Sequence, residues 1–282
     1  MGDLMAGKRG LIMGVANHNS IAWGAAKALS AQGAEIALTY QGEAFGRRVR
    51  PLAAEIGSRL VIPCDVEDTA SLDQVFETLK AEWGTIDFVL HAIAFSDKSE
   101  LKGLYADTTR ENFSRTMLIS CFSFTEVARR AAAIMTNGGS MVTMTYGGAV
   151  RVMPNYNVMG VAKAALEASV RYLAADFGPR NIRINAVSAG PVRTLAGAGV
   201  SDARLMFNFQ RRNAPMRRNT TIEEVGGAVL YLMSDLANGV TGEIHYVDSG
   251  YNIMSMPSLD ELKAQEHRKA IVEGDEIPDD VK

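Results

Sequence analysis

The apolar residues of the chain gather in short runs that are separated by longer stretches with helical spacing. Most of these runs are apolar throughout instead of alternating, which is typical of strands that helices cover on both faces of a parallel sheet. We therefore predict strands at Gly10–Val15, Glu35–Tyr40, Arg59–Cys64, Asp87–Ala94, Ser140–Thr145, Arg183–Val187 and Glu243–Val247.

The stretches between the runs predict helices at Ile21–Gln32, Ala44–Ile56, Ser71–Trp83, Arg110–Thr136, Asn157–Phe177 and Ile222–Ser234. Such alternation favours an α/β fold, a doubly wound, Rossmann-type parallel sheet flanked by helices in a single domain. We place this domain at residues 1–258 and expect a short amphipathic helix near Ala203–Arg212. Residues 259–282 form an acidic C-terminal tail, which we expect on the surface or partly disordered.

Composition excludes several classes of protein. Of 282 residues, 47% are hydrophobic and 22% charged, as in an ordinary soluble globular protein. A net charge of -3 argues against nucleic acid as the main partner. No apolar stretch approaches the roughly 18 residues that span a bilayer. The N-terminus lacks the pattern of a signal peptide, and Cys64 and Cys121 form no CxxC pair, so we expect free thiols in a reducing cytoplasm.

The end of the first predicted strand is a candidate site for phosphate. Gly14 begins a loop of small and polar residues that leads into a helix at Ser20, so backbone amides and a helix dipole would meet there. Gly14 allows a tight turn, Gly24 allows close packing of helix on strand, and Ser20 is placed to cap the helix. Since the loop does not match G-x-G-x-x-G, a plain helix start remains the alternative.

Polar residues at the ends of the next two strands suit a nucleoside. Gln41 can bind a ribose hydroxyl and carries no positive charge, which favours NADH. Arg47 and Arg48 follow closely and leave a cofactor with a 2′-phosphate as the alternative. Asp65 can accept from an adenine amino group, with the amide of Val66 completing the pair. A turn or helix-capping role explains Asp65 equally well.

The strongest candidate for catalysis is the set Tyr146, Tyr156 and Lys163. Tyr156 and Lys163 are seven residues apart, close to two helical turns, so both fall on one helix face. A phenol that is protonated at neutral pH donates to an oxyanion, and a nearby ammonium lowers the pKa of the phenol and grips ribose hydroxyls. A buried core tyrosine beside a surface lysine is the alternative for such a pair alone, but its place after the fifth strand favours an active site.

Together these segments resemble the short-chain dehydrogenase/reductase superfamily and, within it, the bacterial NADH-dependent enoyl-[acyl-carrier-protein] reductases of type I. Ordinary members carry Gly-x-x-x-Gly-x-Gly and Tyr-x-x-x-Lys. This chain instead has Gly14-x5-Ser20-Ile21-Ala22-Trp23-Gly24 and Tyr156-x6-Lys163, the variants of the enoyl reductases. Tyr146, the Pro191–Ala196 run and Thr241-Gly242-Glu243 also match, so that the resemblance covers about residues 6–256.

The resemblance implies reduction of trans-2-enoyl-acyl-carrier-protein thioesters with NADH, the last reductive step of fatty acid elongation, by a cytoplasmic bacterial homotetramer. Tyr146, Tyr156 and Lys163 would be catalytic, Ser96 would lie near the thioester, and residues 195–215 would form the substrate-binding loop and helix. The residues implied to contact NADH are Gly14, Ser20, Ile21, Gln41, Asp65, Val66, Ile93, Lys163, Val192, Arg193, Thr194, Leu195 and Ala196.

Two other functions compete with this one. A 3-oxoacyl thioester or carbonyl reductase of the same superfamily usually has Ser thirteen residues before the Tyr, where this chain has Thr143. A catalytically silent nucleotide-binding protein would lack a use for the Tyr–Lys pair. We expect no metal site, because the four histidines are scattered. An acidic carrier protein should meet exposed basic residues, for which Arg204, Arg211 and Arg212 are the candidates.

Overall fold

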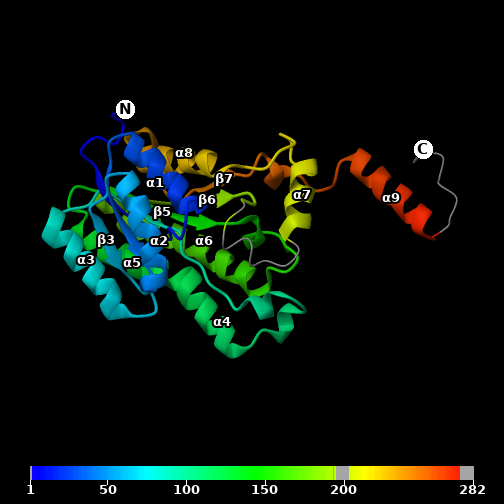
Figure 1. Ribbon diagram of the computed structural model, residues 1–282, viewed down its shortest axis with the longest axis horizontal. Helices are drawn as coiled ribbons and strands as arrows, with labels where there is room; N and C mark the ends of the chain where they lie inside the picture. Colours follow the sequence, from blue (N-terminus) through cyan, green and yellow to red (C-terminus); the bar gives the residue numbers. More distant parts are fainter. Residues whose placement is uncertain (1, 193, 195–202, 274–282) are drawn as a thin grey trace.

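A seven-stranded sheet, parallel throughout, forms the centre of the molecule (Figure 1). The computed structural model describes residues 2–192, 194 and 203–273, without the side chains of 203 and 268–273. The strands are β1 (Arg9–Met13), β2 (Glu35–Tyr40), β3 (Leu60–Pro63), β4 (Phe88–His91), β5 (Gly139–Thr145), β6 (Ile182–Ala189) and β7 (Ile244–Val247). Every predicted strand is present, with ends that differ by a few residues.

The strand order β3-β2-β1-β4-β5-β6-β7 confirms the doubly wound fold. The chain moves outward from β1 to β3, then returns to β4 on the other side of β1 and continues to β7. Ligands bind such sheets at the carboxyl ends of the strands where this reversal occurs, between β1 and β4 here. The topology therefore directs attention to the loops that follow these two strands.

Helices cover both faces of the sheet, as Figure 1 shows. Two separate hydrophobic clusters result, one on each face. The first cluster takes its helical residues mainly from α3 (Thr69–Trp83), α5 (Ser123–Ile134) and α6 (Asn157–Phe177). The second takes them from α1 (Ile21–Ala31), α2 (Gly42–Glu55) and α8 (Ile222–Met233). Burial on both faces explains why the strands read as continuous apolar runs. Short 3-10 turns connect these elements at Lys98–Leu101, Tyr105–Asp107, Gly147–Ala149, Gly178–Arg180, Asp235–Ala237 and Tyr251–Ile253.

Gly24 packs against a helix and not, as we expected, against a strand. A Cβ at Gly24 would lie 2.4 Å from the carbonyl oxygen of Ile222, at the start of α8. Gly226 faces the same crossing, since a Cβ there would lie 2.6 Å from the carbonyl oxygen of Gly24. Two glycines thus let the backbones of α1 and α8 touch, a pairing that the local sequence around Gly24 could not reveal.

The long helix predicted at Arg110–Thr136 is divided in the structure. It consists of α4 (Arg110–Met117), a π-helical segment η3 (Leu118–Phe122) and α5. Within η3 the hydroxyl of Ser120 accepts from the amide of Phe95 at 2.9 Å and donates to the carbonyl of Phe95 at 2.9 Å. The wider turn therefore ties the helix to the loop after β4, an arrangement often found at functional sites.

The C-terminal part of the chain forms two helices outside the sheet layers, α7 (Ala203–Asn213) and α9 (Leu259–Glu273). We expected the tail after residue 258 on the surface or partly disordered, and its first part is helical. Arg212 of α7 pairs with Glu261 of α9 at 3.1 Å, and the Asn213 side chain accepts from the amide of Ser258 at 2.9 Å. Figure 1 shows α9 extending away from the sheet beyond α7. None of the helices that the structure describes has the length and hydropathy needed to cross a bilayer.

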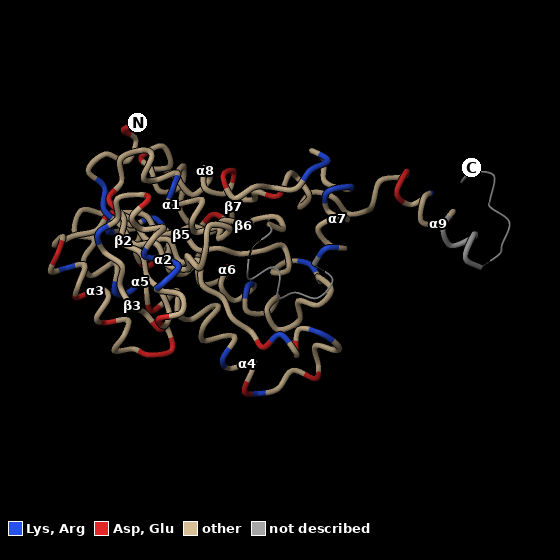
Figure 2. The backbone as a smooth tube through the Cα atoms, in the orientation of Figure 1, with Lys and Arg blue, Asp and Glu red and all other residues tan. Residues whose placement is uncertain are grey.

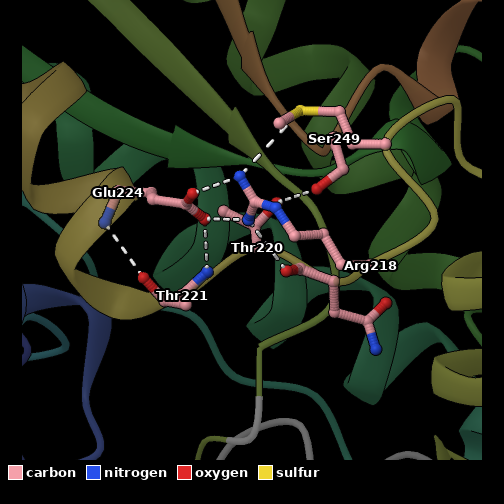
Figure 3. Close-up of polar contacts among 7 residues, drawn as sticks. Arg218, Thr220, Thr221, Glu224 and Ser249 are labelled. Atoms are coloured by element: carbon pink, nitrogen blue, oxygen red, sulfur yellow. Dashed lines mark hydrogen bonds and ion pairs between the residues drawn. The ribbon is translucent and has the colours of Figure 1, made fainter.

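The segment between α7 and α8 is held by a compact polar cluster (Figure 3). Thr221 caps α8 by accepting from the amide of Glu224 at 3.2 Å, and the Glu224 carboxylate accepts from the amide of Thr221 at 2.9 Å. Arg218 also donates to Glu224, at 2.8 Å. A reciprocal cap of this kind fixes where α8 begins, and α8 in turn supports the α1 helix at Gly24.

Candidate active site

The loop after β1 lies at the reversal of the strand order. Gly14 has a φ of +102°, and a Cβ there would lie 2.1 Å from the carbonyl oxygen of Ala92, after β4. Ser20 stands at the N-cap of α1, but its hydroxyl turns back and accepts from the amides of Ala16 at 3.0 Å and Asn17 at 3.1 Å. Because no side chain caps α1, the amides of Ile21 and Ala22 are available to an anion, whereas those of Trp23 and Gly24 donate to the carbonyl of Ser20.

Gln41 and Asp65 are brought together at the ends of β2 and β3. The Gln41 amide donates to a carboxylate oxygen of Asp65 at 3.1 Å, and the other oxygen accepts from the amide of Glu67 at 3.0 Å. Val66 is buried next to them. Arg47 and Arg48 both remain exposed on α2. The two polar residues predicted to meet the adenosine part of a dinucleotide therefore form one unit.

Ile93 and Ser96 follow β4. Ile93 is half-buried and packs on the first core cluster. The Ser96 hydroxyl lies inside a buried polar group, accepting from Thr116 at 3.0 Å and donating to Asn112 at 3.3 Å. These contacts hold the loop after β4 onto α4. They support an anchoring role for Ser96, and its predicted place beside a thioester stays a prediction.

Tyr146 and Tyr156 meet beyond the end of β5. Tyr146 directly follows the strand, and Tyr156 occupies the N-cap position of α6. Their rings form an edge-on contact with centroids 5.1 Å apart and planes at 73°. A Cβ at Gly148 would lie 2.5 Å from the Tyr156 ring, so the turn between the two tyrosines closes tightly over that ring. The structure thus gathers two phenols from one strand-to-helix connection.

Both phenols stay protonated at neutral pH. Burial raises the pKa of Tyr146 to about 12. Burial also raises the pKa of Tyr156, and the neighbouring Tyr146 adds to this effect. We expected the Lys163 charge to lower the pKa of Tyr156, but burial and the neighbouring Tyr146 raise it instead. A protonated phenol is a hydrogen-bond donor, so either tyrosine can stabilise charge that develops on an oxygen.

Lys163 is buried in α6 at 5% exposure, and its ammonium donates to the carbonyl of Met144 at 2.8 Å. Met144 lies two residues before Tyr146, so the lysine reaches the same strand end as the tyrosines. Burial lowers the pKa of Lys163 to about 8, which still leaves the group mostly charged at neutral pH. The predicted helix face therefore does bring a cation to the end of β5.

Thr143 is committed elsewhere and cannot replace a catalytic serine. It is fully buried, lies 3.2 Å from Nδ1 of His91 and donates to the carbonyl of His91 at 3.1 Å. The other ring nitrogen of His91 lies 2.9 Å from the hydroxyl of Ser123. These bonds hold β4, β5 and α5 together, which disfavours a carbonyl reductase that would use the residue at position 143.

The chain after β6 is described in part. Val192 packs on the second core cluster, and the amide of Thr194 donates to its carbonyl at 2.8 Å. Of the predicted cofactor residues, Arg193, Leu195 and Ala196 lie outside the described residues, as do residues 195–202 of the predicted substrate-binding segment. Nothing in the described ranges groups His, Cys, Asp or Glu as metal ligands.

A cavity of about 60 Å³ lies beside Tyr146, and one of its other walls, Gln210, belongs to the predicted substrate-binding segment 195–215. Met153, Gly190, Gln210 and Tyr251 contribute to it from four separate segments of the chain. Gln210 of α7 is buried and donates to the carbonyl of Asp248 at 3.3 Å, which fixes α7 against the end of β7. No local pattern marks Met153 or Tyr251, because only tertiary packing brings them to Tyr146.

Comparison with known proteins agrees with this geometry. Residues 14–252 match the family described as enoyl-(acyl carrier protein) reductase. Enoyl-[acyl-carrier-protein] reductase [NADH] 2 of Rhizobium meliloti is 71% identical over 263 residues, covering 93% of this chain and 98% of its own.

Solved structures show the same architecture. FabI from Candidatus Liberibacter asiaticus has a TM-score of 0.90 at 59% identity and covers 92% of this chain and 100% of its own. The reductase of Anaplasma phagocytophilum in complex with NAD has a TM-score of 0.88 at 56% identity. The match covers 92% of this chain and 97% of its own. With the parallel sheet, the paired tyrosines and the buried lysine, these similarities show that the chain belongs to the enoyl-(acyl carrier protein) reductase family.

Proposed function

We propose that this protein reduces the trans-2 double bond of enoyl thioesters bound to acyl carrier protein, with NADH as the reductant. The product is the saturated acyl thioester, and the reaction is the last reductive step of fatty acid elongation. The observation that carries this proposal is the edge-on pair Tyr146 and Tyr156 beside a lysine fixed at the same strand end, 2.8 Å from the carbonyl of Met144.

The described residues fit a dinucleotide along the carboxyl edge of the sheet. The tight turn at Gly14, with its positive φ, and the uncapped start of α1 suit a pyrophosphate. The Gln41–Asp65 unit suits an adenosine, and Lys163 suits the hydroxyls of the second ribose. Contacts from Ser20, Ile21, Val66, Ile93 and residues 192–196 are part of the same proposal. When bound, NADH would supply the hydride that the β-carbon of the enoyl group receives, and a proton added at the α-carbon completes the reduction.

The hydroxyl of Tyr156 is proposed to donate a hydrogen bond to the thioester oxygen. Negative charge develops on that oxygen as the β-carbon is reduced, and a donor placed there stabilises the transition state more than the ground state. Support comes from the raised pKa of the buried phenol and from the contact that sets its ring against Tyr146. Tyr146 is proposed to orient Tyr156 or the thioester, and Lys163 to bind ribose and add positive potential.

Assembly and location complete the proposal. A homotetramer rests on the resemblance of the chain to the enoyl reductases, and a bacterial cytoplasm is consistent with two buried, unpaired cysteines. Residues 1–258 are proposed to act as one reductase domain. Docking of an acidic carrier is proposed near α7, where Figure 2 shows Lys and Arg gathered. Arg204 and Arg211 are exposed there, while Arg212 is ion-paired with Glu261.

The substitution Tyr156→Phe tests the assignment. It keeps the ring and its packing but removes the donor, so turnover of a crotonyl thioester should fall about 100- to 1000-fold while the Kd for NADH changes little. Tyr172→Phe on the same helix, where the side chain is 75% exposed, is the matched control and should leave both unchanged. Unaltered turnover in Tyr156→Phe would remove this residue from the mechanism, and faster turnover of an acetoacetyl thioester than of crotonyl by the unaltered protein would reject the proposed reaction.

A further inference from the structure

Glu167 is a buried acid that the proposed mechanism does not use. It lies in α6, one helical turn after Lys163, and is only 6% exposed. The hydroxyl of Thr145 donates to its carboxylate at 2.7 Å. Thr145 follows Met144, whose carbonyl accepts from Lys163. Two consecutive residues of β5 therefore hold two side chains of α6, the lysine of the active site and this glutamate.

Glu167 is the acidic group whose charge acts on Lys163. The other titratable groups near the lysine are His91 from β4 and Cys121 from η3. Burial lowers the pKa of His91 to about 3, and burial raises the pKa of the Cys121 thiol, so both are neutral at pH 7. The two tyrosines also remain protonated. Burial lowers the pKa of Lys163, Cys121 and then Glu167 oppose this effect, and within the described chain the ionised form of Glu167 is the anion that compensates the lysine.

The surroundings of Glu167 keep that carboxylate in place. Burial raises its pKa, while the bond from Thr145 and the charges of Arg171 and Lys163 oppose this effect. Tyr246 of β7 faces the carboxylate as well, and burial followed by the charge of Glu167 raises the pKa of this phenol. Arg171 lies one turn further along α6, so the glutamate sits between two cations of the same helix, a favourable spacing for both.

We propose that Glu167 is a positioning residue for the reduction, which keeps the buried Lys163 side chain charged and directed at the carbonyl of Met144. This inference rests on the proposed function, because it gives Lys163 a role in binding NADH and supporting Tyr156. A lysine taken out of water loses its proton easily unless an anion lies nearby. Glu167 supplies that anion one helical turn from the lysine on α6, and the Thr145 hydroxyl holds the carboxylate by a bond of 2.7 Å.

The test is the pH dependence of Glu167→Gln. Glutamine still accepts from the Thr145 hydroxyl but carries no charge, so Lys163 should lose its proton at lower pH. In the unaltered enzyme we expect kcat/KM for a crotonyl thioester to fall as pH rises through about 8. In Glu167→Gln this fall should begin about one pH unit lower, a tenfold change in the proton affinity of the lysine. NADH binding, followed by fluorescence, should weaken over the same shifted range.

Glu126→Gln is the matched control. Glu126 is also a largely buried acid with an i+4 arginine, 3.6 Å from Arg130, but it lies in α5. Its pH profile should coincide with that of the unaltered enzyme. Thr145→Val is a second test, which leaves the carboxyl group in place. Without the Thr145 hydroxyl the pKa of Glu167 rises, so the carboxylate is protonated more easily. The pH profile should therefore shift in the same direction by a smaller amount.

The outcomes separate this inference from the proposed function. Coincident profiles for Glu167→Gln and the unaltered enzyme, in turnover and in NADH binding, would overturn the role of Glu167. An equal shift of the pH profile in Glu126→Gln would also overturn the role of Glu167, because the shift would then be a general effect of removing a negative charge. Failure of the unaltered protein to reduce any enoyl thioester would reject the proposed function instead, and the NADH-binding profiles would still decide whether Glu167 sets the charge of Lys163. If Glu167→Gln does not fold, an unshifted Thr145→Val profile overturns the inference.

Discussion

Gly14→Ala should cost far more stability than an alanine at any ordinary turn glycine. Gly14 has a φ of +102°, a conformation that side chains disfavour, and the added Cβ would lie 2.1 Å from the carbonyl oxygen of Ala92. That oxygen belongs to backbone held by the β1–β4 pairing, where the amide of Ala92 donates to the carbonyl of Met13 at 3.1 Å. The carbonyl therefore cannot move aside without disturbing the strands.

The magnitude follows from two contributions. Backbone strain at a positive φ costs about 1–3 kcal/mol. Forcing a methyl group into a filled space costs about 1–3 kcal/mol more. The sum, roughly 2–6 kcal/mol, is a large part of the stability of a typical domain. Because the displaced loop is the proposed pyrophosphate site, the Kd for NADH should rise at least about tenfold together with the loss of stability.

Gly57→Ala is the control for the strain alone. Gly57 has a φ of +68°, but a Cβ there meets no atom within 4 Å. Urea unfolding followed by circular dichroism should show a loss of about 1–2 kcal/mol for Gly57→Ala and a clearly larger loss for Gly14→Ala. NADH fluorescence titration supplies the second measurement. Equal losses of stability in the two variants would refute the argument from the Ala92 contact.

Three further results are expected. Burial raises the pKa of Cys64 to about 12 and also raises that of Cys121, so both thiols should react with a thiol reagent at pH 8 only after unfolding, and fast reaction of the native protein would contradict this. Arg211→Glu should raise the KM for carrier-bound enoyl substrate several-fold but not that for a small thioester, and equal KM changes would exclude docking at this residue. Thr221→Ala should lower the free energy of unfolding by about 1 kcal/mol through the lost cap of α8, with Thr78→Ala, a mid-helix hydroxyl that bonds the carbonyl of Gln74, as comparison.

Periodicity along the chain located the elements well where burial is uniform. The helix at Asn157–Phe177 has the predicted bounds, and β2 at Glu35–Tyr40 does too. The apolar runs predicted a parallel sheet because both faces of each strand are covered. The same reasoning failed at η3, where the helix is π-helical and the hydroxyl of Ser120 bonds the backbone of Phe95. A bond to a distant loop leaves no trace in the spacing of apolar residues.

Candidate chemistry could be located by its position at strand ends. Parallel strands point their carboxyl ends to one edge of the sheet, so we expected Gly14, Gln41, Asp65 and Tyr146 along that edge. The bond between Gln41 and Asp65 and the contact between Tyr146 and Tyr156 agree with that expectation. The order of the parallel strands explains why these residues lie at one edge, and packing decides which of them touch.

Tertiary structure alone decided which polar groups are buried and what compensates them. The sequence shows Lys163 seven residues after Tyr156. It does not show that the lysine is buried at 5% exposure, with the buried Glu167 one turn away on the same helix. It could not show that Thr143 bonds His91, or that Gly24 meets α8. Local patterns encode which face of an element is apolar. The pKa and reach of a side chain depend on neighbours from remote segments, and those neighbours exist only once the sheet and its helices have packed.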